Sequence, residues 1–212
     1  MKLPNNLAFA VATAFATAVS ITAITNAAEA VASATNTFAV GDYVEYTGGW
    51  SKANGRVFRL KAASGTTFTL EGLDTTDTSL FPAGAGVGTV RKITTWVSVV
   101  GVTAAEVSGG DGKTVEVPLL DSDMPLLLPD GFTATSVTLT IGDEPTAPHH
   151  AALKKISDGV ALTCLRAIIP GAGAGVLLYA GYASYNESPS LSKGNVMATK
   201  AVFTLQNKVV RY

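Results

Sequence analysis

Large and small side chains alternate along the start of the chain. Phe, Val, Thr and Ile occupy the odd positions from 9 to 21, whereas Ala occupies every even position from 8 to 18. A period of two is the spacing of a β-strand whose two faces meet different surroundings. The pattern therefore predicts a strand over residues 8–18 with a small-residue face formed by Ala8, Ala10, Ala12, Ala14, Ala16 and Ala18.

The same stretch also has features of a secretory signal peptide. Lys2 precedes an apolar run from Leu7 to Val19, and an Ala-Glu-Ala sequence follows at 28–30. Under this alternative, the mature protein is a secreted β-sandwich binding or adhesion module that lacks the run. The alternation of side-chain size favours the strand, because a signal helix does not require it. No membrane span is predicted, since the run is short for a bilayer and contains several Thr and Ser residues.

Short β-rich runs separated by turn residues characterise the next part of the chain. Three such runs lie between residues 43 and 71, separated by Gly-Gly, Asn-Gly and Ser-Gly pairs. We predict a small all-β module at residues 26–83, inserted into a main domain formed by residues 1–25 and 84–212. Trp50 is expected to cap the core of this module.

The chain offers few groups for catalysis. The glycine-rich segment 83–88 precedes a predicted strand rather than a helix, so it is interpreted as a flexible linker and not as a phosphate loop. Cys164, the single cysteine, lies in an apolar strand pattern and is expected to be buried. A helix is predicted at 146–159, where His149 and His150 point about 100° apart and are expected at the surface. Because no nucleophile, base or metal ligands converge, we expect neither an enzyme nor a cofactor.

Two β-rich runs near the C-terminus are separated by a polar segment. Residues 176–185 and 196–205 read as strands, and Asn186–Asn195 between them is rich in residues that bend or expose a chain. This order, a strand with Gly-Tyr, a Ser/Pro/Lys segment and a strand ending in Phe-Thr-Leu-Gln, resembles the C-terminal hairpin of long-tailed phage tail tube proteins. A predicted strand at 133–141, the helix and a strand at 160–169 precede the hairpin in the family's order, so the resemblance covers about residues 85–212.

The resemblance implies a fold and a function. The expected fold class is mainly β, a tail-tube-type β-sandwich or barrel with one short flanking α-helix, in addition to the small all-β insert. The protein is expected to self-assemble into stacked hexameric rings that form the phage tail tube, with DNA passing through the tube without specific binding. The other expected partners are the tail tip, tail terminator and tape-measure proteins of the virion, assembled in the host cytoplasm. Another tail component, such as a terminator, would keep the same fold.

The resemblance also assigns contacts between subunits or stacked rings to two loops. One is Leu119–Phe132, whose three consecutive leucines are hard to leave in water, and the other is the polar arm Asn186–Asn195. The acidic residues of the first loop lack EF-hand spacing, so no metal is predicted. The small-residue face of residues 8–18 is a further candidate, either tightly packed or facing the lumen. The candidate contact residues are Leu119, Asp121, Asp123, Met124, Leu126, Leu127, Leu128, Asp130, Asn186, Glu187, Ser188, Pro189, Leu191 and Lys193.

Composition limits the function further. With 47% hydrophobic residues, the 212-residue chain can bury a full core. Only 15% of residues are charged and the net charge is −1, so a basic groove for nucleic acid is not expected. This balance agrees with a tube that does not hold DNA tightly, and the resemblance implies a weakly acidic lumen.

Overall fold

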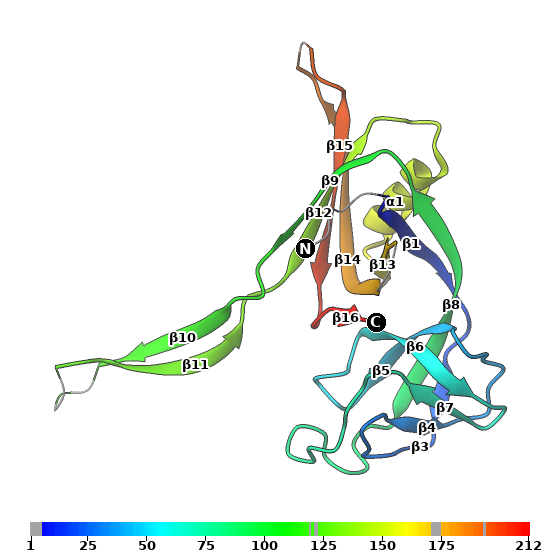
Figure 1. Cartoon of the computed structure of the whole chain (residues 1–212), viewed down its shortest axis with the longest axis vertical. Coiled ribbons are helices and arrows are strands. Elements are labelled where there is room, and N and C mark those ends of the chain that lie inside the picture. The colour runs from blue at the N-terminus through cyan, green and yellow to red at the C-terminus, as the bar shows by residue number, and fades with distance from the viewer. Residues whose placement is uncertain (1–5, 119, 121–122, 171–174, 193) are drawn as a thin grey trace.

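The computed structural model describes residues 6–118, 120, 123–170, 175–192 and 194–212 (Figure 1). This part of the chain is mainly β with one α-helix, as predicted from the sequence. In chain order, the elements are β1 (Ala8–Phe15), β2 (Val19–Ile21), β3 (Ala23–Ile24), β4 (Val31–Ser33), β5 (Tyr43–Gly48), β6 (Arg56–Ala63), β7 (Thr67–Leu70), β8 (Gly88–Val99), β9 (Val102–Ser108), β10 (Gly112–Val117), β11 (Leu126–Phe132), β12 (Ser136–Gly142), α1 (Pro148–Gly159), β13 (Leu162–Ile169), β14 (Gly175–Ser190), β15 (Ala198–Leu205) and β16 (Val210–Arg211).

The main sheet curls back on itself. β8 and β9 are joined by only Val100 and Gly101, yet they lie at opposite ends of the strand order β8-β1-β13-β14-β15-β12-β9. Three Cα–Cα steps span at most about 11 Å, whereas seven strands side by side extend over about 28 Å. The sheet must therefore curl until its two ends meet, in agreement with the predicted sandwich or barrel.

The inside of this curl is a hydrophobic core. Phe9 and Val11 of β1 contribute to it, and α1 closes it with Leu153 and Ile156. Complete burial of one large apolar side chain stabilises a fold by about 1.5–3 kcal/mol. Every second residue of β12 and β15 points into the core, and the buried apolar residues among them are Val137, Leu139, Ile141, Ala201, Phe203 and Leu205.

A second core lies on the outside of the curl. Strands β2 to β7 cover it, and we call them the β2–β7 module. Trp50 is fully buried there, and its indole Nε1 donates a hydrogen bond to the carbonyl of Pro82 at 2.9 Å. The prediction that Trp50 caps the module core is confirmed, as is the burial of Cys164. The outer face of the curl supplies Ala12, Cys164, Leu178 and Ala180 to this second core.

Gly86 packs against the module, whereas the other residues of the segment 83–87 are exposed. The hydroxyl of Tyr46 donates a hydrogen bond to the carbonyl of Gly86 at 2.6 Å. A Cβ atom on Gly86 would lie 2.5 Å from the ring of Trp50 and 2.6 Å from Ile24. Glycine is therefore required here by close packing rather than by mobility.

The N-terminal strand lies inside the sheet. β1 pairs with β8 on one side and with β13 on the other, and its register with β8 shifts between Ala12 and Ala14. The strand ends at Phe15, so it is shorter than the predicted 8–18. Removing residues 1–30, as the secreted alternative requires, would take away a strand that is paired on both sides.

Tyr212 joins the module to the curl. Its backbone exchanges two hydrogen bonds of 3.0 Å with Val176. Its hydroxyl accepts a hydrogen bond from the backbone N–H of Arg59 at 2.8 Å and donates one to the carbonyl of Glu71 at 3.2 Å. Burial raises the pKa of Tyr212 to about 12, so the phenol keeps its proton and can donate at neutral pH.

Candidate assembly surfaces

Part of the outer face of the curl is uncovered and polar. It lies on β9, β12, β15 and the end of β14, at the positions that alternate with core residues. Hydroxyl and small side chains predominate, and one glutamate and one lysine supply its charges. We call this surface the polar face, and its residues are Ala104, Glu106, Ser108, Ser136, Thr138, Thr140, Tyr182, Ser184, Asn186, Lys200, Val202 and Thr204.

β9 forms an open edge beside the polar face. It pairs with β12 on one side, and no other strand of the described chain pairs with it. Its residues from Thr103 to Ser108 are exposed, and they include no proline and a single charge, Glu106. Such an edge is a template for pairing with another chain. The end of β14 lies at the opposite edge of the four strands β14, β15, β12 and β9. β13 stops pairing with β14 at Tyr182, and the N–H of Tyr185 beyond this point donates a hydrogen bond to the hydroxyl of Ser157 in α1 at 3.1 Å.

β10 and β11 form a separate ribbon that projects from the body (Figure 1). We call this ribbon, formed by residues 112–117 and 126–132, the arm. The prediction of a loop over Leu119–Phe132 is wrong for β11, because Leu126–Phe132 pairs with β10. Pro129 and the Asp130-Gly131 pair read as turn signals in the sequence, but the partner strand overrides them.

One side of the arm is apolar. Val115 pairs with Leu128 and Val117 with Leu126, so the four side chains share a face. Val115, Leu126 and Leu128 remain 49%, 48% and 47% exposed. An isolated two-stranded ribbon is marginally stable in water, so this stripe is suited to packing against a partner.

The other predicted residues of this segment have different positions. Leu127 points to the opposite side of the arm, and Asp130 forms an ion pair with Lys113 at 3.5 Å. Asp123 and Met124 are exposed near the tip. Leu119 and Asp121 lie outside the described residues.

The C-terminal hairpin is longer than predicted. β14 continues to Ser190, so five residues of the predicted polar segment 186–195 belong to a strand: Asn186, Glu187, Ser188, Pro189 and Ser190. Pairing with β15 continues to Ser190 but is irregular after Asn186, and this irregular stretch accommodates a proline that cannot donate to the ladder. Glu187 forms an ion pair with Lys154 of α1 at 2.7 Å. Leu191 is exposed beyond the strand, and Lys193 lies outside the described part of the chain.

The small-residue face does not have one environment. Ala10 and Ala12 are buried, and Ala12 belongs to the second core. Ala14 and Ala16 are half-buried, whereas Ala8 and Ala18 are exposed. The shift in register after Ala12 interrupts the strict alternation of the sequence. A role for this face in the assembly stays a prediction.

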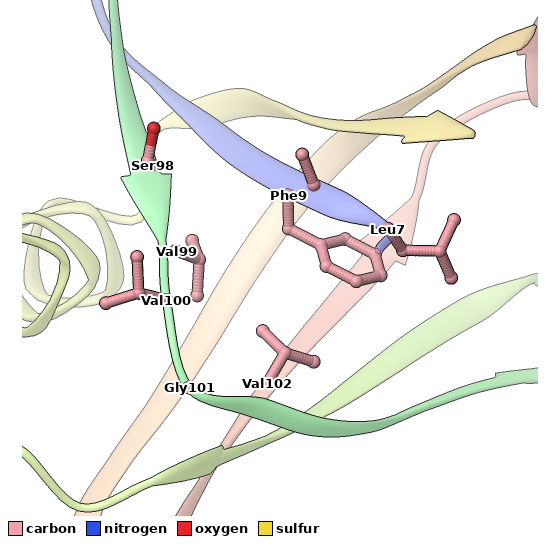
Figure 2. A pocket seen from close by; sticks show the side chains of 8 residues that line it. Leu7, Phe9, Ser98, Val99, Val100, Gly101 and Val102 are labelled. Carbon is pink, nitrogen blue, oxygen red and sulfur yellow. The ribbon is translucent and has the colours of Figure 1, made fainter. Parts of the chain in front are cut away.

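An apolar cavity of about 440 Å³ opens where the two ends of the curl meet (Figure 2). Leu7, Ala8 and Phe9 line one side, and residues 98–102 line the other. Ser98 supplies the one polar side chain of this lining. The cavity is an opening of the first core, since Phe9 and Val99 belong to that core, and its lining contains no acid or base.

Few titratable groups gather elsewhere. Within the described ranges, no three His, Cys, Asp or Glu residues lie close enough to hold a metal ion. His149 is buried against the core, so its predicted surface position was wrong, because the first turn of α1 faces the sheet. Desolvation lowers the pKa of His149, and burial raises the pKa of the Cys164 thiol. In the part of the chain described, no helix is long and apolar enough to cross a membrane.

The edge strand β9 and the strand β10 shape these surfaces but were not predicted from the sequence. Alternation in β9 was weak, because both of its faces are exposed and no core selects large apolar residues. A projecting ribbon, an open sheet edge and an uncovered polar face are typical of a subunit that assembles with copies of itself.

A sequence profile described as phage tail tube protein, TTP, matches residues 48–212. This match covers most of the chain, and the chain belongs to the phage tail tube protein family. It is a structural protein of the virion tail. The resemblance found in the C-terminal hairpin is thereby confirmed, and the secreted alternative is not favoured.

Two solved structures are similar to part of the chain. One is a chain of the virion of a native gene transfer agent particle, and the other belongs to the tail of an empty gene transfer agent particle with C6 symmetry. Each is 16% identical with a TM-score of 0.41, and the similarity covers 55% of this chain and 88% and 86% of those chains, respectively. No curated protein sequence matches significantly.

Proposed function

We propose that the protein self-assembles into stacked hexameric rings that form the tail tube, the conduit for DNA delivery. The observation that carries this proposal is the polar face beside the open edge of β9. In a closed ring, the end of β14 of a neighbouring subunit continues the sheet at β9, which removes the exposed edge. The polar faces of successive subunits then form the wall of the lumen.

The chemistry of the polar face suits the passage of DNA. Hydroxyl groups keep the wall hydrated, and the charges of Glu106 and Lys200 have opposite sign. Tight binding of DNA requires many basic contacts to phosphate, and the polar face does not supply them. DNA therefore passes without specific binding, and the wall is closer to neutral than to the weakly acidic lumen implied by the family.

The arm and the tip of the C-terminal hairpin connect subunits and rings. The apolar stripe of the arm packs against a neighbouring subunit or ring, and the tip of the C-terminal hairpin around Leu191 makes a second contact. The tail tip, tail terminator and tape-measure proteins are the other partners implied by the family, with assembly in the host cytoplasm. The protein has no catalytic role in this proposal and uses no cofactor.

Electron microscopy of the purified full-length protein at rising concentration tests the proposal. We expect hollow tubes from the wild type. A variant with Ala105→Lys and Val107→Lys, both exposed on β9, should stay monomeric, because lysines on an edge strand oppose pairing with another chain. Val40→Lys, an exposed position of the β2–β7 module, is the control and should form tubes. Monomeric wild type at every concentration, or normal tubes from the β9 variant, would contradict the proposal.

A further inference from the structure

We infer that the β2–β7 module is carried on the outer surface of the tube wall, away from the lumen. This inference rests on the proposed function, which assigns the polar face to the lumen. It concerns the position of a separate part of the chain that supplies no residue to the polar face.

Neighbouring residues of three strands point into different cores. In each strand one residue faces the core inside the curl and the next faces the second core under the module. These pairs are Val11 and Ala12 in β1, Leu165 and Cys164 in β13, and Tyr179 and Leu178 in β14. The module therefore covers the outward side of β1, β13 and the start of β14.

The polar face is also an outward side, but of β9, β12, β15 and the end of β14. Because the curl has a single inside, the outward residues of β1 and β13 and those of β12 and β9 point away from a common core and from each other. The link of two residues between β8 and β9 maintains this arrangement. If the polar face lines the lumen, the side that carries the module lies on the exterior of the wall.

The module is fixed in this position. The strand β8 belongs to both parts, since residues 88–92 pair with β5 and residues 93–99 pair with β1. The hydrogen bonds of Tyr212 to Arg59 and Glu71 add a second connection at the other end of the module. The strand shared by two cores and the half-buried side chain of Tyr212 leave no hinge about which the module could turn toward the lumen.

The outward surface of the module suits contact with solvent. Arg59 and Glu71 form two hydrogen bonds of 2.5 and 2.8 Å, and Lys61 pairs with Glu29 at 2.6 Å. These side chains are partly exposed. Transfer of such ion pairs into a dry interface between subunits would carry a desolvation cost, which an external position avoids.

Labelling of single introduced cysteines tests this position in assembled tubes. Thr66→Cys places a thiol in the exposed turn between β6 and β7, and Thr204→Cys places one on the polar face. The native Cys164 is buried and gives the baseline. Each variant is assembled and treated with maleimide-linked gold too large to enter a tube or with a small fluorescent maleimide. Val40→Cys, at another exposed site of the module, is a second module variant, so that the result does not depend on Thr66→Cys alone.

We expect gold along the outer wall of Thr66→Cys and Val40→Cys tubes. Thr204→Cys tubes should take up the small maleimide but no gold. Gold that binds the free subunits of both module variants but not their tubes would overturn the inference. Gold on Thr204→Cys tubes would instead contradict the lumen assignment, and thus the proposed function, independently of the labelling of the module.

Discussion

The apolar stripe of the arm offers a quantitative test of assembly. We consider the triple replacement of Val115, Leu126 and Leu128 by threonine, which keeps the β-propensity of the ribbon but removes most of its apolar surface. The arm supplies no residue to either core. The replacement should therefore weaken the contact between subunits without changing the fold of the subunit.

The expected size of the effect follows from exposure. About half of each side chain remains in water, at 49%, 48% and 47% for Val115, Leu126 and Leu128. Burial of the remaining half in a neighbour stabilises the contact by about 1 kcal/mol per residue, or about 3 kcal/mol for the three. Since 1.4 kcal/mol corresponds to a factor of ten, the critical concentration for tube growth should rise about 100-fold.

Sedimentation of tubes across a range of protein concentrations measures this critical concentration. The matched control replaces Val40, Leu80 and Val87 by threonine, which are 67%, 49% and 44% exposed on the module side of the chain. The control should assemble like the wild type. Both variants should keep the free energy of unfolding of the free subunit within about 1 kcal/mol in urea titrations. A change of less than about threefold in critical concentration, or an equal change in the control, would refute the reasoning.

Three further predictions concern the stability of the subunit. Gly86→Ala should lower the free energy of unfolding by about 1–3 kcal/mol in urea titrations, because the new methyl group meets the ring of Trp50 at 2.5 Å; Gly65→Ala, where nothing lies within 4 Å, should have little effect. The pKa of His149 is lowered by burial, so the unfolded chain takes up the proton first as the pH falls. The free energy of unfolding should therefore decrease below about pH 6.5, by at most about 1.4 kcal/mol per pH unit. Unfolding titrations of His149→Gln should show a weaker decrease. Tyr212→Phe should cost about 1–2 kcal/mol at neutral pH through two lost hydrogen bonds. Since the pKa of Tyr212 rises from 10.0 to about 12 on folding, the wild type should lose stability as pH rises between these values, and the variant should lose less.

Hydrophobic periodicity predicted the elements whose two faces differ most in burial. β12 and β15 bury every second residue, so Val137, Leu139 and Ile141 appear in the sequence as a clear strand. Pro148 at the first position marked the helix, because it suits the first turn and no hydrogen bond is lost there. Burial on one face selects the residue types that periodicity detects, which is why these predictions are confirmed.

The elements that the sequence missed depend on partners distant in the chain. Leu126–Phe132 contains two turn signals and lacks alternation, yet it is a strand because β10 pairs with it. Pro189 suggested a loop, but β15 extends the pairing of β14 on both sides of it. His149 was expected at the surface because it and His150 point about 100° apart and cannot form one metal or acid/base site, whereas the orientation of α1 on the sheet decides its burial. Strand pairing and helix orientation depend on distant parts of the chain, so local composition does not determine them.

The placement of charges on the polar face bears on how DNA could move along the proposed lumen. Lys200 lies on β15 and Glu106 on β9, with β12 between them. If the neighbour's β14 follows β9, the next lysine is again two strands away, so charges of opposite sign alternate about 10 Å apart around the ring. This spacing is close to the Debye length at physiological ionic strength, and alternating charges also cancel at distances beyond their spacing. DNA phosphates near the axis would therefore meet almost no net field, and neither attraction nor repulsion would oppose their passage.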